Sequence, residues 1–523
     1  MCFGIAKRRR YRGYRKEVAG LKKRACRRFK NMNSSYKLKT FENVGYNALG
    51  KIIQLFFQSA ANIILARNLV SSDYGIAGFA MIVVGFVAQF GDMGISTAAV
   101  QVKKLDEEGL YTGFTIKAAL GLVVCAAALV LAPLAGLFFD RAGIVNVVKL
   151  LSLNFVINSF AFLPNITLIR ELNYRKLLTP QLASVAVNSV LAIFLARKGF
   201  GYWSIILANI LSTAVFVIVL NIVRPVKIRF QYNPEKAAEF LRFGGNVFFT
   251  GLLAFLIFNV DNFIIGVFKG AKDLGYYALA FTWGSMICGI LGGVVLSVIF
   301  PTLSKLQGDL LRLKKAYLRV LEYVSFFGIL VNAGLLMVSR EFLYLLLGRG
   351  GEKWLPALGS LQILCIYGVL RLIMEPAGYF ILAVGKSGSL LRAQMIVAAV
   401  ELALIYPALK IFGIEGVAVA VTVAYIFEYI ALYPVLYRKL SLGLSEWIAP
   451  VLPAFVSGFL AAGAVAAAAA VMPLSFAGMA GKIALFIFVY CAAYGIMTKW
   501  KMAAEIRDTI AEFRLKDGDI PKG

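Results

Sequence analysis

Histidine is absent from the 523 residues of this chain. Its absence removes the usual general base of Ser-His-Asp and Cys-His catalysis and the commonest ligand of transition metals. Cysteine is scarce as well: six residues stand at positions 2, 26, 125, 288, 365 and 491, with no C-x-x-C spacing. The last four fall inside apolar runs, where cysteine acts as a small packing residue. We therefore expect a protein that is not an enzyme and that holds no metal ion and no cofactor.

Charged residues are few, at 16% of the chain, whereas 60% of the residues are hydrophobic and the mean hydropathy is +0.78. A water-soluble domain of this composition would aggregate. The charges cluster between apolar runs of about 20 residues, the helix length that crosses about 30 Å of hydrocarbon. The sequence therefore predicts an all-α integral membrane protein with about fourteen transmembrane helices. These spans are expected near 44–66, 75–99, 114–138, 147–169, 177–196, 202–222, 243–267, 276–300, 319–338, 357–383, 389–410, 414–437, 448–472 and 478–498.

Acidic residues are outnumbered, since 27 Asp and Glu stand against 55 Lys and Arg. Fifteen of the basic residues lie in the first 40 positions and most others flank apolar segments, so the charge indicates membrane topology and predicts no nucleic-acid partner. With the basic tail inside, the cytoplasmic segments hold 40 Lys and Arg against 11 in the outer connections. The positive-inside rule then predicts that both termini are cytoplasmic, with the tail touching anionic membrane lipids. Translation from Met32 would remove most of this tail.

An internal repeat relates the two halves of the chain. A shift of 200 residues aligns Gly45 with Gly245, Asn62 with Asn262, Ile64 with Ile264, Asp73 with Asp273 and Gly75 with Gly275. Both places combine a helix, a short D-x-G turn and another helix, so we expect two parallel six-helix lobes. The expected organisation is a cytoplasmic tail at 1–40, a first lobe at 41–222, a cytoplasmic loop at 223–242, a second lobe at 243–437, a terminal helix pair at 438–498 and a cytoplasmic tail at 499–523. In the loop, Asn233 as a cap and Pro234 after it predict a helix start.

Several stretches match one known family, in order, along nearly the whole chain: LVSSDYGIAGFA (69–80), FGDMGIS (90–96), GFGYWSIILANI (199–210), DNFIIGVFKGAKDLGYYALA (261–280), VIFPTLSKLQGD (298–309), GEKWLPA (351–357) and FGIEGVAVA (412–420). The chain resembles the polysaccharide-transporter (Wzx-type) family, whose superfamily also contains MATE drug exporters and the lipid II flippase. The resemblance implies two helical bundles around a central cavity. It also implies a flippase of the bacterial inner membrane that moves an undecaprenyl-diphosphate-linked oligosaccharide, the repeat unit of O-antigen, capsule or exopolysaccharide. Glycosyltransferases and a polysaccharide polymerase would be its partners.

Among the basic residues inside predicted spans, we single out Lys51, Lys117, Lys149 and Arg371. A cation that faces lipid at mid-depth costs about 3 kcal/mol or more, so we predict that these side chains line a cavity and bind the diphosphate of the substrate. Two alternatives stay open. Lys117 and Lys149 lie near span ends and could extend toward the headgroups. Arg371 could pair with Glu375, four residues further along the same helix.

Coupling to protons or sodium ions would need a buried carboxylate. The candidates are Asp92, Asp261, Glu375, Glu401 and Glu428. For Asp92 and Asp261, which lie in turns or at helix ends, a structural hydrogen-bonding role is favoured. The basic cytoplasmic loop with Arg170, Arg175 and Lys176 is a candidate site of substrate loading. Its alternative, favoured by the positive-inside rule, is that the loop only orients the neighbouring helices.

Two other function classes fit the hydropathy. A MATE-like, cation-coupled exporter of small molecules should carry acidic rather than basic residues in its cavity. A membrane polysaccharide polymerase or ligase generally needs a large polar loop outside the membrane, and no predicted outer connection exceeds about twenty residues. ATP-driven export by this chain alone is disfavoured because the sequence has no G-x-x-x-x-G-K-[ST] phosphate loop.

Overall fold

The computed structural model describes residues 50–102, 105–138, 142–171, 173–286, 288–289, 292 and 309–501. Every element within these ranges is helical, as the sequence predicts. After a helix over residues 50–68 come α2 (Ser71–Asp92), α3 (Ile95–Gln101), α4 (Glu107–Phe138), α5 (Ala142–Ser159), α6 (Phe162–Arg170), α7 (Tyr174–Arg197) and α8 (Trp203–Val223). The second half holds α9 (Pro234–Gly284), α11 (Leu310–Met337), α12 (Ser339–Glu341), the π-helix η1 (Phe342–Leu347), the 3-10 helix η2 (Glu352–Ala357), α13 (Leu358–Ala383), α14 (Ser387–Leu440), α15 (Leu444–Ile448), α16 (Leu452–Ala468) and α17 (Phe476–Met497). The expected tail at 1–40 and all but the first three residues of the expected tail at 499–523 lie outside the described residues.

Nine of the described helices are long and apolar enough to cross a membrane, and α5 with α6, bent by 50°, makes a tenth span. Two are too long for one crossing, because the 51 residues of α9 and the 54 of α14 measure about 77 and 81 Å against about 30 Å of hydrocarbon. Each contains one glycine with a left-handed backbone, Gly270 at φ 81° and Gly413 at φ 64°, where the helix breaks. Both breaks fall in predicted gaps between spans, so α14 covers two predicted spans, whereas α9 covers one and the beginning of the next. The exact count of fourteen stays a prediction.

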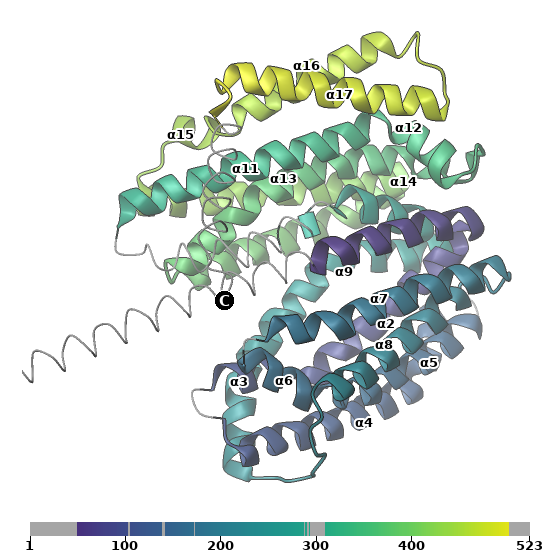
Figure 1. Ribbon diagram of the computed structural model, residues 1–523, viewed down its shortest axis with the longest axis vertical. Helices are drawn as coiled ribbons and strands as arrows, with labels where there is room; N and C mark the ends of the chain where they lie inside the picture. The colour runs from purple at the N-terminus through teal and green to yellow at the C-terminus, as the bar shows by residue number, and fades with distance from the viewer. Residues whose placement is uncertain are drawn as a thin grey trace, which may run out of the picture.

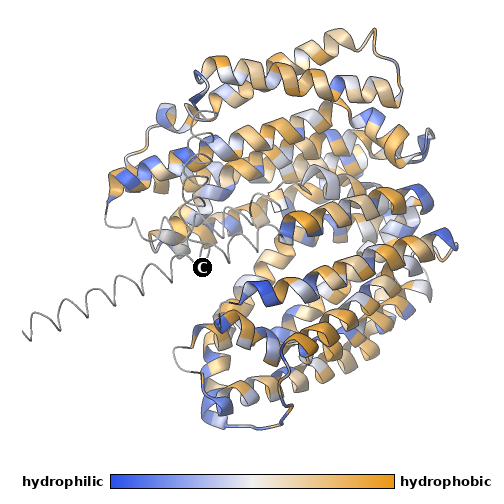
Figure 2. Ribbon diagram, in the orientation of Figure 1, coloured by the Kyte–Doolittle hydropathy of each residue, from blue (hydrophilic) through white to orange (hydrophobic). Residues whose placement is uncertain are grey.

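The helices gather into two bundles (Figure 1). One contains α2 to α8; the other contains α11, α13 and α14, with α16 and α17 on its outer edge. Helix α9 connects the two, because it packs against α2 of the first and against α13 and α14 of the second. Figure 2 shows apolar residues along the helix bodies and hydrophilic ones concentrated at helix ends and in connections, as expected of a protein surrounded by lipid. The exact lobe limits, 41–222 and 243–437, stay predictions.

The two D-x-G segments of the internal repeat, predicted as turns, are helical: Asp73–Gly75 lies in the first turn of α2, and Asp273–Gly275 follows the break at Gly270 in α9. They meet at the boundary between the bundles. Gly75 in α2 lies against the backbone of Ala271, and Gly275 in α9 lies against that of Ser71. A Cβ atom at either glycine would overlap the opposing backbone, so this close approach requires glycine at both positions. Positions related by the sequence repeat therefore form equivalent contacts across the lobe boundary.

The connection between the lobes begins a helix at the predicted place. The Asn233 side chain accepts hydrogen bonds from the backbone N–H groups of Glu235 and Lys236 at 2.9 and 3.2 Å, and Pro234 occupies the first helical position. The Lys236 ammonium also pairs with Asp106, just before α4, and holds the pKa of that carboxyl below its usual value. The connection is thereby fastened to the first bundle.

A buried ion pair joins the terminal helices to the second bundle. Lys482 Nζ of α17 lies 2.5 Å from Glu341 Oε1 of α12, and the two side chains are 10% and 7% exposed. Sequence reasoning missed this pair, although Lys482 lies inside the predicted span 478–498, because the two residues are 141 positions apart. Removing one partner of such a pair leaves an uncompensated buried charge, so the contact fixes where α17 packs.

Candidate functional site

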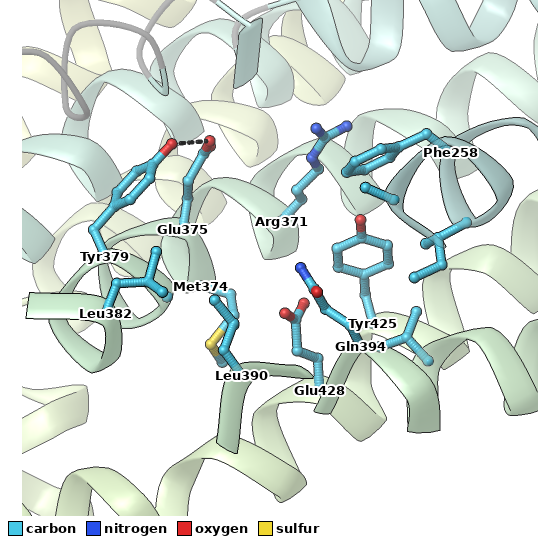
Figure 3. A pocket seen from close by; sticks show the side chains of 14 residues that line it. Phe258, Arg371, Met374, Glu375, Tyr379, Leu382, Leu390, Gln394, Tyr425 and Glu428 are labelled. Carbon is cyan, nitrogen blue, oxygen red and sulfur yellow. Dashed lines mark hydrogen bonds between the residues drawn. The ribbon is translucent and has the colours of Figure 1, made fainter. Parts of the chain in front are cut away.

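A cavity of about 160 Å³ lies within the second bundle (Figure 3). Helix α13 supplies Arg371, Glu375 and Tyr379, whose spacing of four residues places them on one helix face. The two halves of α14, divided at Gly413, together supply Gln394, Tyr425 and Glu428, and α9 supplies Phe258. The cavity therefore combines two carboxylates, one guanidinium and an amide with aromatic walls.

The Arg371 guanidinium lies against an aromatic ring and not against Glu375. Its carbon is 4.7 Å from the centre of the Phe258 ring, and Nη1 is 3.4 Å from the Tyr367 hydroxyl. The Glu375 carboxylate instead accepts a hydrogen bond of 3.2 Å from the Tyr379 hydroxyl. Among the described residues, the other oxygen of Glu375 is buried and meets no donor. Both Arg371 and Glu375 thus keep capacity for a bound group.

Two further candidate carboxylates, Asp261 and Glu401, are each only 1% exposed. Asp261 accepts hydrogen bonds from the Tyr277 hydroxyl at 2.8 Å and from the backbone and side-chain N–H groups of Asn262 at 2.7 and 3.0 Å. These contacts satisfy it, in line with the structural role favoured for this residue. Glu401 differs, because one of its oxygens is buried without a donor among the described residues. An ionised carboxylate in that position is costly unless a proton or a cation accompanies it.

A second cavity, of about 260 Å³, lies inside the first bundle between α2, α3, α4, α5, α6 and α8. Lys117 lines it, and its Nζ is 2.5 Å from Asp92 Oδ1, which also accepts a hydrogen bond from the Ser96 hydroxyl. The predicted cavity cation and a predicted coupling carboxylate are therefore partners of each other. Their charges cancel, and the pair connects α4 to the end of α2.

The remaining basic candidates line neither cavity. Lys51 is half-buried on the helix over 50–68, and Lys149 is exposed on α5. Arg170 donates through Nη1 to three backbone carbonyls at the end of α3, at 2.8 to 3.2 Å, which are orphan acceptors of that helix end. This placement fits the alternative of a loop that orients helices. Arg175 and Lys176 are exposed at the start of α7.

Three hydrogen bonds that sequence reasoning missed join the two lobes near the end of the helix over 50–68, and we call this group of contacts the latch. Lys353 Nζ and Trp354 Nε1 both donate to the Ala66 carbonyl at 2.9 Å, and Arg67 Nε donates to the Leu346 carbonyl at 2.6 Å. The Ala66 carbonyl is free to accept because it lies in the last turn of its helix. The GEKWLPA stretch (351–357) stood out in the sequence as a match to the family, but nothing in it identified the helix over 50–68 as its partner. By the predicted topology, this latch closes the outer end of the protein.

Comparison with known proteins places the chain in a family context. The sequence profile of a family described as "Polysaccharide biosynthesis protein" matches residues 64–358. The chain is 25% identical over 399 residues to the lipopolysaccharide biosynthesis protein WzxC of Escherichia coli (strain K12), covering 75% of this chain and 79% of that one. It is 24% identical over 321 residues to the succinoglycan biosynthesis transport protein ExoT of Rhizobium meliloti (strain 1021), covering 61% and 65%.

Among solved structures, the lipid II flippase MurJ in an inward closed conformation matches with a TM-score of 0.71. The match covers 88% of this chain and 99% of that one at 16% identity, so it bears on the fold alone. The helical, MATE-like architecture expected from the sequence is thereby confirmed.

Proposed function

The chain belongs to the polysaccharide biosynthesis protein family, and from this premise we propose that it is a flippase for an undecaprenyl-diphosphate-linked oligosaccharide. The observation that carries the proposal is the family match over residues 64–358, which covers the first bundle and α9 and extends into the second bundle through α11. The relatives named above are a lipopolysaccharide biosynthesis protein and a succinoglycan biosynthesis transport protein. The substrate would be the repeat unit of O-antigen, capsule or exopolysaccharide, moved from the cytoplasmic to the outer face of the inner membrane, with both termini of the protein in the cytoplasm.

Such a substrate needs a carrier for a physical reason. Moving one ion into hydrocarbon costs on the order of 20 kcal/mol in the ideal limit, a barrier that permits roughly one event per hundred seconds. Each sugar hydroxyl left unpaired in alkane adds about 4 kcal/mol or more. A polar cavity between two lobes removes most of this barrier, and no catalytic residue is needed.

Alternating access follows from how the lobes meet. If the predicted orientation holds, the latch at Ala66 and the contacts at Gly75 and Gly275 would close the outer end. Their opening, with closure at the inner end, would release the substrate outward. Arg371 and Lys51 would contact the diphosphate. The candidates for ion coupling would be Glu375 and Glu401, each of which has a buried oxygen without a donor among the described residues. Glu428, which shares the cavity with Glu375, is the third candidate, and Asp92 and Asp261 rank behind these three.

A second candidate function is favoured by one observation. The cavity in the second bundle holds two carboxylates, Glu375 and Glu428, against one guanidinium, an acidic balance that also suits cation-coupled export of small cationic molecules. The basic substrate candidates in the first lobe do not fit that function. A deletion strain separates the two, because loss of an exporter would sensitise cells to cationic compounds and leave the surface polysaccharide intact.

The flippase proposal predicts a different phenotype. In the deletion strain, lipid-linked repeat units should accumulate on the cytoplasmic face and the surface polysaccharide should be lost, while synthesis of the repeat unit continues. Repeat units that reach the outer face and remain unpolymerised would overturn the proposal and assign the protein to polymerisation or ligation. Co-purification from the native membrane would test its association with a polymerase and glycosyltransferases.

A further inference from the structure

Two asparagines of the first bundle, the exposed Asn158 and the half-buried Asn165, have no side-chain hydrogen-bond partner in the part of the chain that the structure describes. Asn158, in the last turn of α5, and Asn165, in the first turn of α6, both line the 260 Å³ cavity. Neither side-chain amide bonds another described residue, whereas the nearby Asn154 donates to Asn209 at 3.0 Å. An amide in the middle of a span is costly unless a polar group meets it. These two are therefore available to a ligand.

The bend between α5 and α6 shapes this place. The two helices meet at 50°, and Ala161 at the bend lines the cavity. Broken helices of this kind border binding sites in many transporters, because irregular backbone at membrane depth is tolerated where it borders a polar cavity. The bend therefore separates the two amides while leaving both on the cavity wall.

The cavity is electrically balanced. The Lys117 ammonium is matched by the Asp92 carboxylate at 2.5 Å, so the pair attracts a diphosphate weakly. Together with the two amides it offers donors and acceptors in similar number. The phenyl rings of Phe155 and Phe216 add apolar walls. Mixed donors and acceptors beside aromatic faces suit a pyranose ring, whose hydroxyls lie at its edge and whose C–H groups form its faces.

From this geometry we propose that the cavity in the first bundle is a subsite for one uncharged sugar ring of the substrate, with Asn158 and Asn165 bonding its hydroxyls. The inference rests on the proposed flippase function and assigns a role that the charged residues do not cover. The volume of about 260 Å³ is slightly below the roughly 300–1,000 Å³ of pockets for drug-sized ligands. One ring therefore fits, and a whole repeat unit does not.

The test compares two kinds of lipid on the full-length protein in nanodiscs. Native mass spectrometry would measure binding of undecaprenyl diphosphate without sugar and of three lipids that carry glucose, galactose or N-acetylglucosamine. The wild type should bind at least one sugar-bearing lipid more tightly than the bare diphosphate. Asn158→Leu and Asn165→Leu should each reduce that preference by roughly threefold to tenfold, the effect of one lost hydrogen bond, without changing the affinity for the bare lipid.

Asn259→Leu is the matched control, because this amide lies on α9, bonds the Phe255 carbonyl of its own helix at 2.8 Å and lines neither cavity. Asn158→Ala and Asn165→Ala replace the leucine variants if those do not purify as monodisperse protein. Three results would overturn the subsite and leave the flippase function intact. They are a preference for sugar that survives the cavity variants, an equal loss of affinity for both kinds of lipid, and no preference for sugar in the wild type. Failure of the wild type to bind any of the four lipids would instead count against the flippase itself.

Discussion

Weakening the latch at Ala66 should open the outer end of the protein. Trp354→Phe removes the indole N–H that donates at 2.9 Å and keeps an aromatic ring in a fully buried position, and Lys353→Met removes the second donor to the same carbonyl. A neutral hydrogen bond contributes about 0.5–1.5 kcal/mol and one from a charged group about 1.5–3. Both hydrogen bonds end on the same carbonyl, so we treat their loss together. We expect the double variant to destabilise the closed state relative to the open state by about 2–4 kcal/mol, which lowers the closed-to-open ratio by roughly 30-fold to 1,000-fold.

Spin labels at two exposed positions near the latch, Val70 and Glu352, would report this shift as a distance distribution in a background without the native cysteines. The wild type should give one short distance, and the double variant should add a longer population. Trp203→Phe is the control, since this ring lies at the start of α8 against Tyr202. If the double variant keeps the single short distance, the latch does not hold the outer end closed and the reasoning fails.

Three further predictions concern particular contacts. Arg371→Gln should abolish polysaccharide export with normal protein levels in the membrane. Arg371→Lys should support only weak export, because lysine stacks less well on an aromatic ring. Loss of the protein from the membrane would instead assign Arg371 to folding. Lys482→Met should lower the free energy of unfolding by about 3–5 kcal/mol, and adding Glu341→Leu should recover most of that loss. Thermal unfolding in detergent measures the stability of both variants. A single variant as stable as the wild type would contradict the buried pair. Gly75→Val should disrupt the lobe contact and export, whereas Gly78→Ala, which meets open space, should preserve both in an export assay.

Part of the candidate site followed from the sequence alone. Arg371, Glu375 and Glu428 stood out as charges inside apolar runs, and the cavity in the second bundle brings them together. Their partners could not be read in the same way. The Arg371–Glu375 pair suggested by spacing gives way to contacts with Phe258 and Tyr379. Spacing shows which residues share a helix face, but neighbouring helices decide which contact forms.

The sequence by itself determined the class of protein. Its hydropathy and the lengths of its apolar runs required a helical membrane protein, because backbone groups in hydrocarbon need internal hydrogen bonds. Only the tertiary structure decided that Lys117 pairs with Asp92, that Lys482 pairs with Glu341, and that the two repeat segments touch. These contacts join residues far apart in the chain, and packing of whole helices, which no local pattern encodes, brings them together.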